Sequence, residues 1–300
     1  MLEEMVERPV SRREFLKDLV KAALGLAVSA SVIGKASAKT NAERYQRRYD
    51  TFGHKVLDIE GLSKLGTNWQ DYAMLDDIID VAKERTATYL SESRRRNDAA
   101  GILAQIDKTL RELGFIYKVN TLLNNGLKTR KIDCDNYVSI YMGIADALNL
   151  PLSAVMAPNH TFIRWNFGDR TYMNWEPIGD IGPKNDSYFI KEYGISRESI
   201  ENGAFMRSLS RDEAESIGYL AAGNELIKRR EFDRSIPYLS KAVEHDPKNV
   251  LAHKNLGYAY IQKGNFQKAL EQFKIVVNLA PQDVDSIKNI DNLQKYRKST

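Results

Sequence analysis

Cysteine is nearly absent from this sequence, and its scarcity excludes two classes of protein. The 300 residues include one cysteine, Cys134, and four histidines. A single cysteine cannot form an intrachain disulfide, and no group of Cys and His has the spacing of a zinc site. His54, His245 and His253 lie far from Cys134 along the chain, so we interpret them as packing or surface residues. The sequence therefore predicts neither a disulfide scaffold nor a metal protein.

The sequence also lacks a large excess of charge of one sign. The formal net charge is only +4, and the densest run of like charge, three arginines at residues 94–96, is typical of a solvated helix end. The sequence therefore gives no support to a nucleic-acid partner. A hydrophobic fraction of 43% over 300 residues is ample for globular cores and favours about two domains.

Long apolar runs are missing, and the nearest approach lies close to the N-terminus. Residues 19–34 are weakly apolar and contain Lys21, which makes them a poor membrane span. The motif SRREFLK at residues 11–17 resembles the twin-arginine export signal, and Ala-Ser-Ala at residues 36–38 resembles a cleavage site. We therefore predict a signal peptide at residues 1–38 and a periplasmic or extracellular protein. Its membrane contact is transient, or becomes an anchor if the signal is not cleaved.

The segments before Cys134 give weaker signals. Residues 39–68 are polar and contain three glycines, so we predict a loosely packed lead-in. Apolar residues at helical spacing then predict two helices, at about residues 75–89 and 103–113, with Gly114 ending the second. We expect both to pack around the helix that carries Cys134.

The helix that begins at Cys134 follows from the spacing of apolar residues. They recur at intervals of three and four between residues 138 and 148, ahead of Pro151. Unpaired N–H groups and the positive helix end favour a thiolate at Cys134, which predicts a lowered pKa. The backbone N–H of Cys134 also suits a developing oxyanion. We interpret Asp133 and Asp135 as capping residues that oppose the thiolate.

A strand at residues 152–157 and a hairpin of residues 161–165 and 171–175 follow. A turn centred on Gly168 places His160 opposite Glu176. The apolar face carries Ile163, Trp165, Met173 and Trp175, and the polar face carries His160, Arg164, Tyr172, Asn174 and Glu176, with Phe162 as the apolar exception. We predict that the apolar face meets the core and the polar face turns towards the start of the Cys134 helix.

Cysteine, histidine and carboxylate in this order supply a nucleophile, a base and an orienting group for acyl transfer. The stretch resembles the transglutaminase-like superfamily, with its papain-like core, and more narrowly the prokaryotic branch with a tetratricopeptide tail. The resemblance covers about residues 70–205. It rests on NNGL at 124–127, RKIDC at 130–134, IADALNLPL at 144–152, APNHTFIR at 157–164 and NWEP at 174–177.

The resemblance implies that Cys134 is the nucleophile, His160 the base and Glu176 the third member, with no cofactor. The superfamily usually has aspartate where Glu176 stands, and some members of this branch have lost the cysteine. Asn174 shares the face of His160 and is the alternative orienting residue.

Two flanking segments are candidate parts of the site. Asn124 and Asn125 lie where related folds place an oxyanion donor, with turn formation as the alternative role. Residues 179–194 read as a loop that forms one wall of the substrate cleft.

The C-terminal part repeats itself. Gly223 and Gly257, Phe232 and Phe266, and Pro247 and Pro281 each recur at a spacing of 34 residues, the length of a tetratricopeptide repeat. We predict repeats at 216–249 and 250–283 and a closing helix at 284–296. A capping box at residues 210–213 opens this C-terminal part. Because two repeats bury little apolar surface alone, we expect them to dock on the preceding domain.

The predicted organisation is α+β: a transglutaminase-like domain at residues 69–208 and a helical tetratricopeptide region at 209–300. The predicted function is cysteine-dependent acyl transfer on a peptide or protein substrate, with hydrolysis favoured over cross-linking. The alternative is a non-catalytic protein that uses the same core and the repeats to bind a protein partner.

Overall fold

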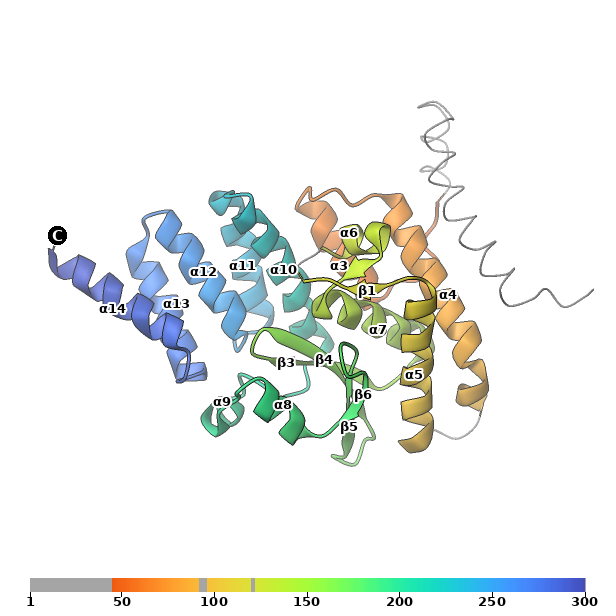
Figure 1. Cartoon of the computed structure of the whole chain (residues 1–300). Helices are drawn as coiled ribbons and strands as arrows, with labels where there is room; N and C mark the ends of the chain where they lie inside the picture. The colour runs from red at the N-terminus through yellow and green to blue at the C-terminus, as the bar shows by residue number, and fades with distance from the viewer. Residues whose placement is uncertain (1–44, 92–95, 120–121, 300) are drawn as a thin grey trace, which may run out of the picture. The chain divides into compact units, whose positions relative to one another are not determined.

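The computed structural model describes residues 45–91, 96–119 and 122–299 (Figure 1). The predicted signal peptide lies outside the described residues, and so do the side chains of the arginine run at 94–96. Within these ranges the chain has a helical part, one four-stranded antiparallel sheet and a helical C-terminal part. This confirms the predicted mixed class, whereas the transglutaminase-like identity of the core stays a prediction. Along the described ranges no helix is both long and apolar enough to cross a membrane.

A buried helix corrects the prediction of a loosely packed lead-in. Helix α3 (Phe52–Leu62) contacts both α7 (Cys134–Leu148) and α10 (Arg211–Lys228). Its glycine serves close packing, because a Cβ at Gly53 would come within 2.9 Å of the Leu75 side chain. The prediction for residues 39–68 is therefore wrong for α3, because Gly53 allows tight contact there and does not mark a loose segment.

The two predicted helices that follow are confirmed. Helix α4 spans Trp69–Ser91 and α5 spans Arg96–Glu112, and Gly114 ends the second with a φ of +84°. Both contribute buried residues to the core that also holds α7. In addition, Asp107 of α5 accepts a hydrogen bond of 2.7 Å from Trp175 Nε1, which ties α5 to the sheet.

A buried carboxylate holds the helix that precedes the Cys134 segment. Glu60 of α3 is 0% exposed and accepts the backbone N–H groups of Leu123 and Asn124 at 2.6 and 2.9 Å. These belong to the start of α6 (Leu123–Thr129), where helix N–H groups have no intrahelical partner. Burial raises the pKa of Glu60 to about 8. The segment predicted as a lead-in therefore caps α6.

Helix α7 begins at Cys134, as predicted. The Asp133 side chain caps it by accepting the Asn136 N–H at 3.0 Å, and Asn149 ends it in the left-handed conformation with a φ of 53°. A short parallel pair, β1 (Ile116–Tyr117) and β2 (Lys131–Ile132), lies just before it in the chain.

The sheet has the strand order β3-β4-β5-β6, with every neighbouring pair antiparallel. The strands span Leu152–Ala157, His160–Asn166, Tyr172–Glu176 and Gly182–Lys184. Ile163 pairs with Trp175, so the turn centres on Asp169 and His160 does not lie directly opposite Glu176. The predicted register is wrong by two residues. Because side chains alternate with a period of two, the predicted faces remain correct.

The turn itself explains the shifted register. Gly168 and Arg170 both have positive φ, of 91° and 66°. Asp169 between them accepts the Thr171 N–H at 3.0 Å, and the Phe167 N–H donates to the Thr171 carbonyl at 3.0 Å. A side chain that hydrogen-bonds its own backbone two residues on stabilises such a turn. The turn is therefore centred on this aspartate and not on the glycine.

The two faces of the sheet are both covered. Ile163 and Trp165 belong to the core that includes α7, as predicted. On the other face, Phe162 packs on Phe189 of α8 (Asp186–Glu192) with ring centroids 3.7 Å apart. The predicted polar face is therefore covered by α8 and an apolar cluster, and the prediction that it turns towards the start of α7 is wrong. Residues 179–194 form β6 and α8 where we had predicted a loop.

Five helices follow the short helix α9 (Arg197–Glu201). They are α10, α11 (Phe232–His245), α12 (Val250–Gln262), α13 (Phe266–Leu279) and α14 (Val284–Ser299). They form the two predicted helical hairpins and the closing helix, drawn in blue-green to blue in Figure 1. A Cβ at Gly257 would come within 2.9 Å of the Phe273 ring, so glycine allows the helices of the second hairpin to approach. The capping box of Ser210 and Glu213 is present.

The repeats dock on the preceding part of the chain, as predicted. Ala222 and Leu226 of α10 form an apolar cluster with Ile59 and Leu65. A second cluster joins Val250 of α12 to residues that follow α9. Residues 47–300 therefore form one compact unit.

Candidate active site

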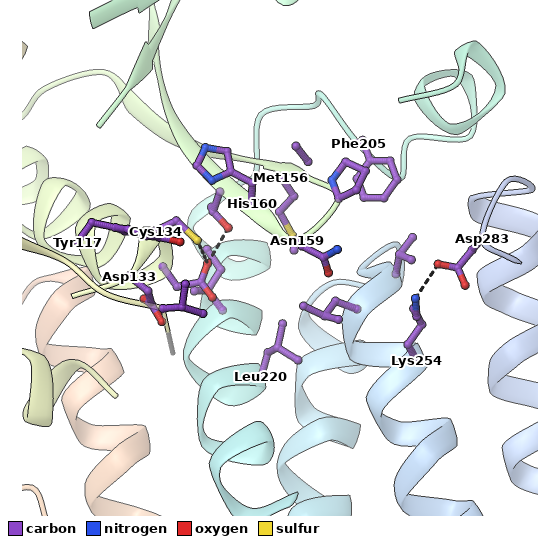
Figure 2. Close-up of a pocket in the computed structure, with 18 residues that line it drawn as sticks. Tyr117, Asp133, Cys134, Met156, Asn159, His160, Phe205, Leu220, Lys254 and Asp283 are labelled. Atoms are coloured by element: carbon purple, nitrogen blue, oxygen red, sulfur yellow. Dashed lines mark hydrogen bonds and ion pairs between the residues drawn. The ribbon is translucent and has the colours of Figure 1, made fainter. Parts of the chain in front are cut away.

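A cavity of about 220 Å³ opens where the start of α7 meets the turn between β3 and β4 (Figure 2). The core contributes Cys134, Asn159 and His160 to its lining, and α10 and α12 contribute Leu220 and Lys254. The turn is tight, since Asn159 has a φ of 55°. The structure thus brings the predicted nucleophile and the predicted base to one cavity. The predicted cleft wall at residues 179–194 does not line it.

The predicted base and the third group are hydrogen-bonded. His160 Nε2 lies 2.8 Å from Glu176 Oε2, although the two residues are diagonal across the strands. The second oxygen of Glu176 accepts the Ile178 N–H at 2.9 Å, so the carboxylate is held at both ends. Because Nε2 is engaged, Nδ1 is the ring nitrogen left to take a proton. It has no hydrogen-bond partner among the described residues.

Tyr193 packs on the face of the imidazole, and this contact was not predicted from the sequence. Its ring stacks on His160 with centroids 4.6 Å apart and an interplanar angle of 8°. Tyr193 directly follows α8, which packs on the same face of the sheet through Phe189. Stacking and the Glu176 hydrogen bond together restrict the orientation of the ring. No motif marked Tyr193, because its place depends on how α8 folds back.

Cys134 is half-buried and hydrogen-bonds its neighbour in sequence. Its Sγ–H donates to Asp135 Oδ1 at 4.0 Å. Within the described part of the chain, no hydrogen bond joins the sulfur to His160. Cys134 and His160 therefore share a cavity without forming a hydrogen-bonded pair.

The electrostatics of the thiol are opposite to the prediction. Burial raises the pKa of Cys134, and the carboxylates of Asp135 and Asp133 raise it further. Hydrogen bonds from the backbone of Thr161 and Asp135 act in the opposite direction and are weaker. The helix N-terminus carries only about half a unit charge, which desolvation and two neighbouring carboxylates outweigh. Cys134 therefore rests as a thiol and needs a base to become a nucleophile.

Asp135 does not have the capping role that we predicted for it. Its Oδ1 accepts the Thr161 hydroxyl at 2.6 Å, which ties the first turn of α7 to β4. Burial raises the pKa of Asp135, whereas the Thr161 hydrogen bond and the nearby His160 oppose that shift. Asp133 alone caps the helix. No sequence pattern indicated this contact between Thr161 and Asp135.

The asparagines have other partners. Asn174 accepts a hydrogen bond from Arg164 Nε at 2.8 Å and donates to Asp186 at 2.7 Å, so Glu176, not Asn174, orients His160. Asn124 donates to the Leu65 carbonyl and to Thr67. Asn125 is exposed in α6, and neither Asn124 nor Asn125 lines the cavity. Both lie in a helix and not in a turn.

Among the described residues, no three side chains of His, Cys, Asp or Glu are grouped in a way that could hold an ion. Cys134 and His160 line the cavity, and Glu176 is hydrogen-bonded to His160.

Comparison with known proteins supports the prediction of tetratricopeptide repeats in the C-terminal part. Residues 220–284 match the family model of the tetratricopeptide repeat, so the C-terminal helices carry such repeats. The mitochondrial import receptor subunit TOM70 of Homo sapiens is 33% identical over 61 residues, which are 20% of this chain and 10% of that protein. The Rattus norvegicus protein of the same name is 32% identical over 61 residues. This chain therefore spans about a tenth of the TOM70 proteins.

A second relative extends the similarity beyond the repeats. A UPF0162 protein of Pasteurella multocida is 25% identical over 191 residues, which cover 60% of this chain and 69% of that protein. Because 191 residues are more than the repeat region contains, the similarity reaches into the part that carries the sheet. The transglutaminase-like identity of that part stays a prediction.

Proposed function

We propose that this protein is a cysteine-dependent acyl-transfer enzyme with a transglutaminase-like core that acts on amide or peptide bonds. The observation that carries the proposal is the His160–Glu176 hydrogen bond of 2.8 Å beside a cavity that Cys134 also lines. Glu176 fixes the ring through Nε2 and leaves Nδ1 for the nucleophile. The same division of roles operates in triads of nucleophile, base and orienting group.

The reaction begins with transfer of the Cys134 proton to His160 Nδ1 as the sulfur attacks the carbonyl carbon. For this transfer, the thiol must exchange its hydrogen bond to Asp135 for one to the imidazole. The resulting imidazolium is stabilised by Glu176 and gives its proton to the departing amine, which leaves a thioester on Cys134. Water then attacks the thioester, again with His160 as base, and releases a carboxylic acid and the free thiol.

The start of α7 supplies the electrostatic part of the proposed mechanism. The oxygen of the attacked carbonyl becomes negatively charged, and the N–H groups at a helix N-terminus stabilise such an anion. The backbone N–H of Cys134 is the proposed donor. Hydrolysis is the favoured outcome by resemblance, and an amine in place of water would give cross-linking.

The test uses the single cysteine of the chain. We would treat the protein with p-nitrophenyl acetate at pH 7 and follow release of nitrophenol together with acetylation of Cys134 by mass spectrometry. We expect a burst of about one equivalent that is lost in Cys134→Ser and slowed about 10²-fold in His160→Gln. His245→Gln is the matched control, because His245 pairs with Asp212 away from the cavity. Acetylation that is equally fast in His160→Gln would refute the assigned base.

The second candidate is a binding protein that uses the same core and the repeats. Two observations favour it. The thiol is hydrogen-bonded to Asp135 and has a raised pKa, and the chain matches both the tetratricopeptide repeat model and, over 61 residues, an import receptor subunit. Absence of any acyl-enzyme, together with capture of a defined protein partner, would select this function.

We also propose export by the twin-arginine pathway, from the motif at residues 11–17. Replacing Arg12 and Arg13 together by lysine should leave the chain in the cytoplasm of the producing cell. Fractionation with an antibody to the chain measures this. Product that stays with membranes after a salt wash would indicate an uncleaved anchor.

A further inference from the structure

One wall of the Cys134 cavity belongs to the tetratricopeptide region. Ile217 and Leu220 of α10, and Val250, Leu251 and Lys254 of α12, line it. These are the first helices of their hairpins, and no side chain of α11 or α13 lies among the described lining residues. Stacked helical repeats use such a shared face to bind ligands. The repeat face and the cavity of the proposed nucleophile are therefore the same surface.

The lining of this cavity suits an apolar side chain. Figure 2 shows Met156 and Phe205 on one side of the space and Leu220 on the other. The volume of about 220 Å³ is below the roughly 300–1,000 Å³ of sites that enclose a whole small ligand. It accommodates one or two residues of an extended chain and excludes a folded surface.

The charges of the cavity select against an anion. Lys254 is the single lysine or arginine among the described lining residues, and its Nζ is bound to Asp283 at 2.7 Å, with Asp285 at 3.6 Å. At the other end lie Asp133 and Asp135. A ligand with negative charge would therefore meet carboxylates at both ends, whereas a cationic group would be attracted.

We infer that α10 and α12 form the substrate-binding wall of the Cys134 site, and that this wall takes an extended peptide with an apolar side chain and without negative charge. That the bound peptide is also the substrate rests on the proposed function. The binding itself does not, since it needs neither the thiol nor the imidazole. Leu251 is the specificity residue most open to substitution, because it is only partly buried.

Fluorescence polarisation of the full chain carrying Cys134→Ser tests the inference without turnover. The probes are two fluorescein-labelled hexapeptides, one with a leucine pair flanked by lysines and one with the same pair flanked by glutamates. We expect the lysine peptide to bind at least about tenfold more tightly, since like charges juxtaposed at an interface are strongly unfavourable. Leu251→Ser should weaken that binding about tenfold, the size of a buried leucine contact.

Two further variants complete the design. Ile287→Ser is the matched control, because Ile287 is an exposed residue of α14 that does not line the cavity, and its affinity should be unchanged. If Leu251→Ser proves misfolded by circular dichroism, Lys254→Gln takes its place. Removing the ammonium leaves Asp283 and Asp285 uncompensated, so the preference for the lysine peptide should increase several-fold.

Equal affinity for the two peptides, or binding that is insensitive to Leu251 and Lys254, would overturn the inference. So would binding of a fluorescein-labelled synthetic peptide of residues 1–38 with no binding of the hexapeptides, because the occupant would then be the chain itself. Peptide binding without acetylation of the unmodified protein would uphold the inference and end the proposed chemistry. Acetylation of Cys134 without peptide binding would do the reverse.

Discussion

The described residues include two buried pairs of histidine and carboxylate, and one of the two adjoins the cavity. His54 Nε2 lies 3.0 Å from Asp76 Oδ1, and its Nδ1 lies 2.8 Å from the Thr51 hydroxyl. His160 Nε2 lies 2.8 Å from Glu176, but its Nδ1 has no hydrogen-bond partner in the described chain. His54 is 0% exposed and His160 is 9% exposed. A hydrogen bond to a carboxylate is therefore not a mark of chemistry by itself.

The difference lies in the second ring nitrogen. In His54 both nitrogens stabilise the fold, between α3 and α4. In His160, which lines the cavity, one nitrogen is hydrogen-bonded to Glu176 and the other has no hydrogen-bond partner among the described residues.

The two histidines should differ most in what they contribute to stability. We expect His54→Ala to lower the free energy of unfolding by about 3 kcal/mol, because it leaves the Asp76 carboxylate and the Thr51 hydroxyl buried with a partner missing. His160→Ala should cost about 1 kcal/mol, since cavity water can replace the ring beside Glu176. Urea denaturation followed by tryptophan fluorescence measures both. Equal losses would abolish the distinction.

The two carboxylates should separate activity from stability. Glu176→Gln is expected to slow acetylation of Cys134 about 10²-fold, because the imidazolium formed in the reaction loses its counter-charge. Asp76→Asn is the matched control and should leave the acetylation rate of the folded protein unchanged. The rate of nitrophenol release per folded molecule is the readout. A slow Asp76→Asn protein would show that the distant pair also supports the site.

The pH dependence of stability should carry the signature of His54. Burial lowers the pKa of His54 below its usual value of 6.5, so below about pH 6.5 the unfolded chain binds a proton that the folded chain does not. Stability therefore falls as the pH drops below this value, with a limiting slope of about 1.4 kcal/mol per pH unit from one proton. His54→Gln should flatten the curve in that window, and urea midpoints between pH 5 and 8 measure it. An unchanged slope would contradict a buried neutral His54.

The smallest effect concerns the competition between Asp135 and His160 for the thiol. Asp135 raises the pKa of Cys134 and accepts its hydrogen bond. Asp135→Asn keeps an oxygen for Thr161 but removes the charge, so the pKa of Cys134 should fall and alkylation by iodoacetamide at pH 7 should accelerate about three- to tenfold. Asp283→Asn, at the far end of the same cavity, is the control. A rate that does not change would mean that Asp135 does not hold the thiol.

Local sequence patterns predicted the elements well. Helix α7 begins at Cys134 and β3 spans Leu152–Ala157 as expected, because helical spacing and a bounded apolar run are properties of neighbouring residues. The repeat spacing likewise predicted the hairpins. The predicted register of β4 and β5 was wrong, because the register depends on the conformation of the turn. That turn is centred on Asp169 and not on Gly168.

The candidate side chains follow from the amino-acid sequence alone, because it contains one thiol, and a histidine and a glutamate on the same face of a hairpin. Their surroundings and their partners depend on the tertiary structure. The fold stacked Tyr193 on the imidazole, placed two carboxylates and a buried environment around the thiol, and brought α10 and α12 to the cavity. These features depend on desolvation and on contacts between segments distant in the chain, and no local pattern records either.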